Sequence, residues 1–569
     1  MKTLERSAPP TPIGRRGQRA VLFAMCLSLV LVVASVSALN LALPDLAVQL
    51  GATNSALTWI ADGYTVALAA LVLPLGALGD RVGRRKVLIA GNLVFGGAAV
   101  LAACSASTAQ LIVCRVVMGI GAAMIMPGTL STITAVFPKD EKDRGVAIWS
   151  GFAAAGAIIG MLAAGGLLEG FSWKAVFVTS AATALLCALA ALLLAPETRS
   201  STREPFDFPG SATTALAVGA LVYGIIEGND RGWSRPEVLA AFAVALLALA
   251  GYVALGLRSR HPLLDPRLFA LRGFGSGALA ILTQFLAVFG FFFVGLQFLQ
   301  LILGYSPLKS ALALVPVAAV VLPVSASTPR LAERLGAKVV MPAGLLCLAG
   351  GMLWLTRLHA DSGYPPFLGA LLLAGLGIGL TSATGTSAIV DSLGPDSQGV
   401  ASAMNDTARE VGSAVGIALM GSVFAGHYRA ALPDHLAGLP AGAAEAVQHS
   451  AAGGLEVAAH LGARGPALAA TVREAFMSGF TAAMGITAAI LAAAALVCAL
   501  TAPRHNRTKG TAPTGPQESA PAAPESGPHA GSGSDAGAGP APESASAADA
   551  LPEAALTGSA SADRPRDRS

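Results

Sequence analysis

Charged residues are scarce in this chain of 569 residues. They make up 12% of it, about half the share usual in soluble proteins, whereas apolar residues make up 54%. The mean hydropathy is +0.65. A soluble protein of this length would need far more charge to cover its surface. The composition therefore excludes a soluble globular protein, a wholly disordered chain, collagen and a coiled coil, and it predicts an integral membrane protein with many spans.

Cysteines are also few, and their spacing argues against metal and redox chemistry. None of the six forms a C-x-x-C pair, and each lies within or at the edge of an apolar run. The histidines His435, His449 and His460 have no acids or cysteines near them at ligand spacing, so we expect no metal site there. The chain also has no P-loop sequence, G-x-x-x-x-G-K-[ST]. We therefore expect no cofactor, no direct use of ATP and no enzymatic activity.

The net charge of +4 is the sum of two unlike regions. From Thr511 onward there are eight acids and three arginines, so this tail carries −5 and the rest of the chain +9. The tail consists almost entirely of Ala, Pro, Ser, Gly and Glu, which cannot bury enough apolar surface to fold. We predict a disordered tail and no role for the basic residues in binding nucleic acid.

Apolar runs long enough to cross a bilayer recur along the rest of the chain. A membrane helix needs about 20 mostly apolar residues. Fourteen such runs are found, near residues 20–42, 56–78, 87–106, 110–131, 145–168, 175–195, 211–228, 237–257, 275–299, 307–328, 338–356, 366–388, 399–427 and 474–502.

The distribution of Lys and Arg between the runs predicts the orientation. If the N-terminus is cytoplasmic, 24 basic residues fall in inner segments and 8 in outer ones. Cytoplasmic loops carry such an excess, and a missed helix would reverse it for every later loop. We predict a multi-pass protein of the cell membrane with both termini in the cytoplasm, monomeric and surrounded by lipid.

A short motif follows the second apolar run. It reads GALGDRVGRRK over residues 76–86, and it contains ordered glycines and one carboxylate among basic side chains, which a plain positive-inside anchor would not need. The motif resembles the signature between helices 2 and 3 of the major facilitator superfamily, G-x-x-x-D-R-x-G-R-R-[KR], and matches it in full. The resemblance implies a cytoplasmic gating motif whose charges hold the two halves together in one access state. Its residues are Gly76, Asp80, Arg81, Gly83, Arg84 and Arg85.

A degenerate copy of this motif, RLAERLGAK, follows the tenth run at residues 330–338. A copy eight helices later suggests two six-helix bundles with an inserted pair. We therefore predict an all-α polytopic membrane protein of the major facilitator fold, with 14 transmembrane helices in a 6+2+6 arrangement. The expected parts are a cytoplasmic N-terminus (1–19), an N-terminal six-helix bundle (20–195), the inserted helices 7 and 8 with flanking loops (196–274), a C-terminal six-helix bundle (275–502) with a partly helical outer loop (429–473), and the cytoplasmic tail (503–569).

Two further helices resemble motifs of this superfamily. Helix 4 carries Arg115 inside an apolar span, in the pattern R-x-x-Q-G-x-G-A-A with Met118 in place of the glutamine. An arginine at this depth is normally paired or faces a cavity. Helix 5 resembles the exporter signature G-x-x-x-G-P-x-x-G-G at Gly156, Gly160 and Gly165, but lacks its proline. Close helix packing alone would also explain these glycines.

Few acids lie inside the spans, and they are the candidates for proton coupling. Helix 1 has Ser35 where the family usually has an aspartate, so the acids of other helices gain weight. Burial disfavours a charged carboxylate and a nearby arginine favours it, so a group balanced between the two can bind a proton from one side and lose it on the other. In the alternative interpretation, Asp62 caps helix 2 at the interface, and Arg409 and Glu410 form a structural pair near the inner membrane edge. The proton-coupling candidates are Asp62, Arg115, Asp406, Arg409 and Glu410.

The sequences DFPG (207–210) and GIIEGNDRGW (224–233) resemble the fourteen-helix drug:proton antiporter family in particular. The resemblance implies a proton-coupled exporter of hydrophobic or amphiphilic drugs or antibiotics that works by alternating access and confers resistance. The alternatives are an importer or metabolite facilitator of the same superfamily and, more remotely, a membrane sensor or enzyme on this scaffold. Candidate cavity residues, chosen as polar or aromatic groups within spans, are Asn40, Tyr64, Gln284, Phe291, Phe292 and Gln297.

Overall fold

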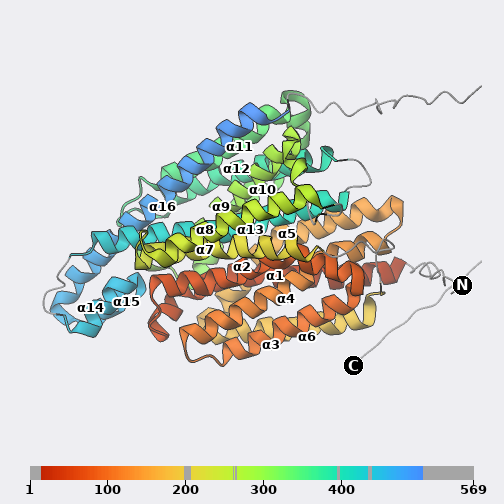
Figure 1. Cartoon of the computed structure of the whole chain (residues 1–569). Helices are drawn as coiled ribbons and strands as arrows, with labels where there is room; N and C mark the ends of the chain where they lie inside the picture. The colour runs from red at the N-terminus through yellow and green to blue at the C-terminus, as the bar shows by residue number, and fades with distance from the viewer. Residues whose placement is uncertain are drawn as a thin grey trace, which may run out of the picture. The chain divides into compact units, whose positions relative to one another are not determined.

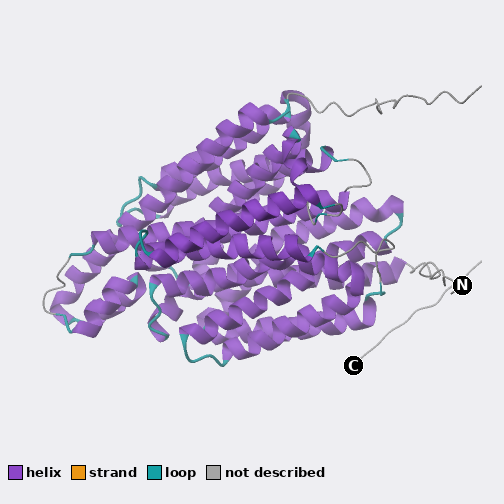
Figure 2. Ribbon diagram, in the orientation of Figure 1, coloured by secondary structure: helices purple, strands orange, loops and turns teal. Residues whose placement is uncertain are grey.

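The computed structural model describes residues 15–197, 207–259, 262, 265–393, 398–433 and 439–503 (Figure 1). The chain divides into two units, Met1–Thr508 and Lys509–Ser569, and every described residue belongs to the first. In this described part all regular structure is helical (Figure 2). Residues 1–14 of the expected N-terminal segment and 504–569 of the expected tail lie outside it.

Thirteen helices of the described part are long and apolar enough to cross a membrane, judged by length and composition. The fifth expected span is helix α5, of which Gly156–Gly170 is described as a shorter apolar helix. The all-α fold class is confirmed. The helices are α1 (Arg15–Gln49), α2 (Asn54–Val82), α3 (Arg84–Ala103), α4 (Thr108–Val136), α5 (Lys139–Gly170), α6 (Lys174–Leu194), α7 (Phe208–Arg231), α8 (Pro236–Arg258), η1 (Pro266–Ala270), α9 (Arg272–Gln297), η2 (Phe298–Ile302), α10 (Pro307–Leu335), α11 (Ala337–Leu355), α12 (Tyr364–Asp391), α13 (Gln398–Ala431), α14 (Ala441–His449), α15 (Ala451–His460), η4 (Gly462–Arg464) and α16 (Gly465–Thr501).

Helix pairs recur in the two parts of the chain. In the first part α1 packs on α5 and α6, α2 packs on α4, and α3 packs on α4 and α6. In the second part α9 packs on α13 and α16, α10 on α12, and α11 on α12 and α16. We call α1–α6 the first set, and α9–α13 with α16 the second set. Helices α7 and α8 pack on each other, and α7 also contacts α2 and α13, which is the pattern expected for an inserted pair.

The two loops that resemble each other in sequence also share a glycine with positive φ at the turn. Gly83 ends α2 with φ 129°, and Gly336 ends α10 with φ 83°. Side chains with a Cβ atom rarely adopt these values of φ, so glycine is required at both turns. Each glycine also precedes the first residue of the next helix, so the similarity of the two sequences reflects a repeated helix–turn–helix.

The segment between the last two predicted spans differs from its expected boundaries. Helix α13 continues to Ala431 and α16 begins at Gly465, so Arg429 and Arg473 lie inside helices rather than in a loop. Between them lie the short helices α14 and α15. The difference has a simple cause: hydropathy marks only the part of a helix that crosses the apolar core of a bilayer, and helical backbone can continue past it.

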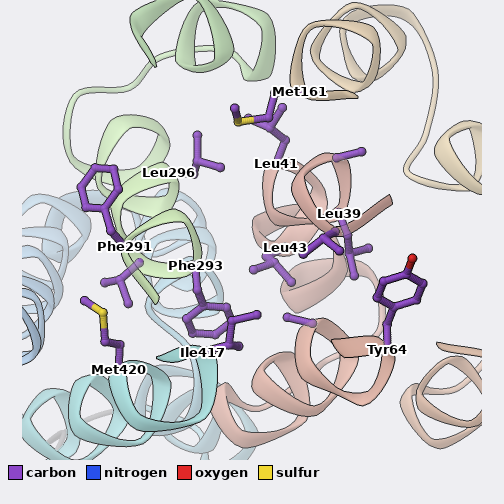
Figure 3. Close-up of a cluster of buried hydrophobic side chains, with 14 of the residues drawn as sticks. Leu39, Leu41, Leu43, Tyr64, Met161, Phe291, Phe293, Leu296, Ile417 and Met420 are labelled. Carbon is purple, nitrogen blue, oxygen red and sulfur yellow. The ribbon is translucent and has the colours of Figure 1, made fainter. Parts of the chain in front are cut away.

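The two sets meet around a cluster of buried apolar side chains (Figure 3). Phe293 lies beside Ile417 and close to Leu43, and Met161 lies beside Leu41. At the predicted outer end the sets also make polar and backbone contacts. Gln300 Nε2 donates to the carbonyl oxygen of Leu41 at 3.2 Å. In this structure the sets are therefore in contact at the predicted outer end.

Candidate functional site

The predicted gating loop is held by contacts within the first set. The Arg84 Nη1 atom donates to the Ser131 carbonyl of α4 at 3.0 Å, and Arg85 donates to the Leu192 carbonyl of α6. Gly76 lies against Pro127, because a Cβ atom on Gly76 would be 3.0 Å from the Pro127 Cβ. The side chain of Asp80 lies outside the described part. A role of this loop in holding the two sets together stays a prediction.

Arg115 is 1% exposed and joins α4 to α2. Its Nε donates to the Ile60 carbonyl at 3.0 Å, and its Nη2 donates to the Ala61 carbonyl at 3.4 Å. Its guanidinium carbon lies 4.5 Å from the centroid of the Tyr64 ring, a cation–π contact. The prediction that this arginine must have partners is met by backbone carbonyls and a ring.

Tyr64 connects four helices of the first set and does not line an open cavity. It is 0% exposed, and its hydroxyl donates to the Val32 carbonyl of α1 at 3.0 Å. Its ring meets the edge of Phe95 of α3, with 6.3 Å between centroids, and lies under Arg115 of α4.

Asp62 is 0% exposed and lies eight residues after the start of α2, whose N-cap is Thr53. The interpretation of Asp62 as a helix cap at the interface is therefore wrong. Its Oδ1 accepts a hydrogen bond from the Thr65 hydroxyl, and its Oδ2 has no hydrogen-bond partner among the described residues. Trp59 and Val66, three residues before it and four after, pack with α7 and α13. Since this spacing shares one helix face, Asp62 lies on the face of α2 toward α7 and α13.

The three charged residues of α13 form one cluster, as their spacing predicts. Arg409 Nη1 lies 3.9 Å from Asp406 Oδ1, and their side chains are 19% and 13% exposed. The guanidinium carbon of Arg409 lies 4.7 Å from the centroid of the Phe285 ring of α9, and its Nε has no hydrogen-bond partner in the described part. Glu410 is also partly exposed. The described ion pair of this cluster is therefore Arg409–Asp406, not Arg409–Glu410.

The glycines of α5 make two kinds of close contact. A Cβ atom on Gly160 would lie 2.5 Å from the Ala34 Cα, and one on Gly156 would lie 3.3 Å from the Val33 Cβ, so both glycines bring α5 against α1. A Cβ atom on Gly165 would lie 2.8 Å from the Leu308 Cα of α10. Gly165 is therefore placed where the first set meets the second.

Most of the cavity candidates are engaged in packing. Asn40 donates to Val36 of its own helix at 3.4 Å, and Gln297 donates to Phe293 at 2.8 Å. Gln284 donates to the Ser382 hydroxyl of α12 at 2.6 Å. The Phe291 ring points away from α1 (Figure 3), and its centroid lies 5.9 Å from that of the Phe367 ring, so it packs within the second set. Phe292 is partly exposed. A role of these residues in a cavity stays a prediction.

Sequence reasoning missed the junction of α2 with α7. Trp59 Nε1 donates to Glu227 Oε1 at 3.0 Å, and Arg231 Nε lies 2.6 Å from Glu227 Oε2. The carboxylate of Glu227 raises the pKa of Arg231 above its usual value. Ser422 of α13 donates to the Ile225 carbonyl at 2.7 Å. The sequence feature that could have indicated this junction is Glu227 in GIIEGNDRGW, because an acid just inside the end of an apolar run needs a partner.

Comparison with known proteins gives matches over most of the chain. The family model described as Major Facilitator Superfamily matches residues 25–417. The chain is 32% identical to the multidrug efflux pump LfrA of Mycolicibacterium smegmatis over 503 residues, which cover 87% of this chain and 99% of that protein. It is 29% identical to the tetracenomycin C resistance and export protein of Streptomyces glaucescens, over 86% of this chain and 92% of that protein. It is 31% identical to the methyl viologen resistance protein SmvA of Salmonella typhimurium, over 71% of this chain and 81% of that protein.

Among solved structures, the chain is similar to a bacterial homologue of the human lysosomal transporter Spinster in its inward-facing, unoccupied conformation. The TM-score is 0.64 at 17% sequence identity, over 86% of this chain and 98% of that one. At this identity the likeness extends to the fold alone.

Proposed function

The chain belongs to the major facilitator superfamily, in its drug:proton antiporter family, and from this membership we propose that it exports hydrophobic or amphiphilic compounds in exchange for protons. The matched family and relatives are transporters. Proton coupling, the direction of transport and alternating access are the parts of this function that we propose.

The observation that supports proton coupling most directly is the surroundings of Asp62. Its carboxyl group is fully buried, and one of its oxygens has no hydrogen-bond partner in the described part of the chain. An isolated carboxylate is expensive in such surroundings, so the group is most stable with a proton bound. If the second set moved away and water reached Asp62, the charged form would become favourable and the proton would be released.

The α13 cluster supplies a second group with different surroundings. Asp406 has Arg409 as a counter-ion at 3.9 Å, and its side chain is 13% exposed, whereas Asp62 is 0% exposed. Glu410 follows one helical turn after Asp406 on the same face of α13. Acids in different surroundings thus lie on α2 and α13, which face each other between the sets. A change in the packing of these two helices would change the surroundings of the acids on both.

Alternating access is supported by the distribution of contacts between the sets. The polar and backbone contacts of Gln300 with Leu41 and of Gly165 with Leu308 lie at the predicted outer end. We propose that this is the inward-facing conformation, in which a compound enters from the cytoplasm or the inner leaflet. Opening of the outer end would require these contacts to separate. Both termini would then lie in the cytoplasm, as the distribution of basic residues predicts.

The names of the relatives support the substrate class and a role in resistance. They describe multidrug efflux, tetracenomycin C export and methyl viologen resistance. A membrane potential of 100 mV supplies about 2.3 kcal/mol per charge, which is enough to drive export. We propose that the proton gradient supplies the energy and that no bound cofactor takes part.

The test uses inverted membrane vesicles with an imposed pH gradient, acid inside. Adding an exported compound should release protons from wild-type vesicles. Asp62→Asn and Asp406→Asn should each abolish this release. Glu456→Gln is the matched control, because Glu456 is an exposed acid of α15 paired with His460, and it should behave like the wild type.

Two results would contradict the proposal. Transport that survives complete collapse of the proton gradient would exclude proton coupling. Normal proton release in both Asp62→Asn and Asp406→Asn would show that the coupling acids lie elsewhere.

A further inference from the structure

Three aromatic side chains form a row on α9. The rings of Phe285 and Phe289 are stacked, with centroids 5.8 Å apart and an interplanar angle of 19°. The rings of Phe289 and Phe292 meet edge to face at 5.9 Å. The residues are separated by four and three positions, so they share one helix face. We call Phe285, Phe289 and Phe292 the aromatic row.

The other faces of α9 are occupied by helices of the second set. Gln284 binds Ser382 of α12 at 2.6 Å. Gly290 lies against Met420 and the Gly416 carbonyl of α13, where a Cβ atom would be 2.7 Å from the carbonyl oxygen. The Ser276 carbonyl accepts a hydrogen bond from the thiol of Cys498 of α16 at 3.6 Å. The aromatic row is centred on the remaining face, and Phe285 at its predicted inner end also packs against a cluster of α9, α12 and α13 side chains that includes Ile281, Ile389 and Ala408.

The face of the aromatic row points toward the first set. Continuing by four residues at a time, the same face reaches Leu296 and then Gln300. Gln300 binds the Leu41 carbonyl of α1, and Leu296 is directed toward α1 and Met161 (Figure 3). The aromatic row therefore lies between the two sets, at the centre of the protein.

The exposed surface of this face is interrupted at Leu296, beyond which Gln300 is again partly exposed. Leu296 is 0% exposed, whereas Phe292, Phe289 and Phe285 are all partly exposed. Each of the three rings packs against buried apolar side chains and still keeps part of its surface exposed. The buried Leu296 thus ends the row toward the predicted outer end, and each of the three rings keeps some accessible surface.

We propose that the aromatic row is a binding subsite that receives the planar aromatic part of an exported compound by ring stacking. This inference rests on the proposed export function and adds a location and a recognised chemical group. Aromatic pairs are stabilised beyond their apolar area, and partly exposed rings offer faces without rearrangement of the core. The guanidinium of Arg409 already lies over Phe285, so Phe289 and Phe292 are the rings that we expect a compound to contact first.

The position of the row also relates binding to the charged cluster. Arg409 lies over the Phe285 ring and is paired with Asp406. A planar group that extends along the row to Phe285 must compete with the guanidinium for that ring. Binding would therefore displace the counter-ion of Asp406, which connects the aromatic row to the acids of α13.

Binding of ethidium, a planar fluorescent aromatic, to the purified full-length protein tests the proposal. Leucine keeps the apolar character of each position but removes the ring. Phe289→Leu and Phe292→Leu should each raise the dissociation constant about fivefold, and the double variant should raise it further. The matched control is Phe298→Leu, because the Phe298 ring stacks on Phe367 and Phe480 within the second set. This control should bind ethidium like the wild type.

An unchanged dissociation constant in the double variant, or an equal increase in Phe298→Leu, would overturn the proposal. So would wild-type protein that does not bind ethidium. Binding is measured without a proton gradient, so its outcome is independent of the vesicle assay. Export of a non-aromatic compound in the absence of ethidium binding would refute the subsite and leave the export function intact.

Discussion

Replacing Gly165 by alanine should favour opening of the outer end. The new Cβ atom would lie 2.8 Å from the Leu308 Cα and 3.1 Å from the Leu308 nitrogen. Carbon atoms pack best at about 3.5–4.0 Å, so α5 and α10 would have to separate by roughly 0.7 Å or more. Both nearest atoms belong to backbone and cannot rotate away. Overpacking of this kind costs about 2 kcal/mol, and only the conformation with the contact bears the cost.

A shift of about 2 kcal/mol changes the ratio of the two conformations about thirtyfold. Gly166→Ala is the control, because a Cβ atom on the neighbouring Gly166 meets nothing within 4 Å, and both substitutions gain the same helix propensity. The reporter is Thr58→Cys in a variant without native cysteines. Thr58 is 2% exposed and lies against Gly421 of α13, so it is shielded where α2 and α13 meet.

The assay is the rate at which a membrane-impermeant maleimide, added outside intact cells, labels the thiol introduced by Thr58→Cys. The Gly165→Ala variant should be labelled about thirtyfold faster than Gly166→Ala, because the labelling rate follows the population of the conformation with an open outer end. Equal labelling rates would refute the reasoning, because they would show that the Gly165–Leu308 contact does not hold the outer end closed.

Substitutions at two positions of α2 test its contacts. Tyr64→Phe removes the hydroxyl that donates to Val32, so it should lower the free energy of unfolding in detergent by about 1 kcal/mol. Tyr64→Leu also removes the ring under Arg115 and should lower it by about 2 kcal/mol more; equal losses in the two variants would contradict the cation–π contact. Trp59→Phe removes the hydrogen bond to Glu227 and should lower the free energy of unfolding by about 1.5 kcal/mol. Glu227→Gln keeps an acceptor and should lower it by less. The reverse order would show that the charge of Glu227 matters more than the hydrogen bond.

The elements of this fold were predictable because each span carries its own signal. Hydropathy located the apolar core of the helices, and the two similar loops after α2 and α10 indicated the repeat. The extensions of α13 and α16 and the short helices α14 and α15 were not located, because they lie beyond the apolar runs. Hydropathy gives no signal for helical segments that lie outside the apolar core of a bilayer.

The directions of the side chains were much less predictable. Tyr64 and Phe291 were selected because they are aromatic residues inside spans, and both rings turn out to pack within one set of helices. Whether a side chain faces a neighbouring helix or the centre depends on which helix lies beside it, and a single sequence contains no such information. Phe285 and Phe289 were missed for the same reason, since each alone resembles any lipid-facing phenylalanine.

Two of the places where the sets face each other differ in chemistry, and the inserted helix α7 lies beside one of them. Between α5 and α10 the described contact is the close backbone approach at Gly165. The α2–α13 contact lies next to the ionisable Asp62, and the ionisable Glu410 lies one turn before Ala414 of that contact. A charged group that faces lipid costs about 2.5–3.5 kcal/mol even on a permissive scale. Helix α7 packs on both α2 and α13, through Trp59–Glu227 and Ser422–Ile225. It therefore places protein rather than lipid beside the α2–α13 contact that contains Asp62.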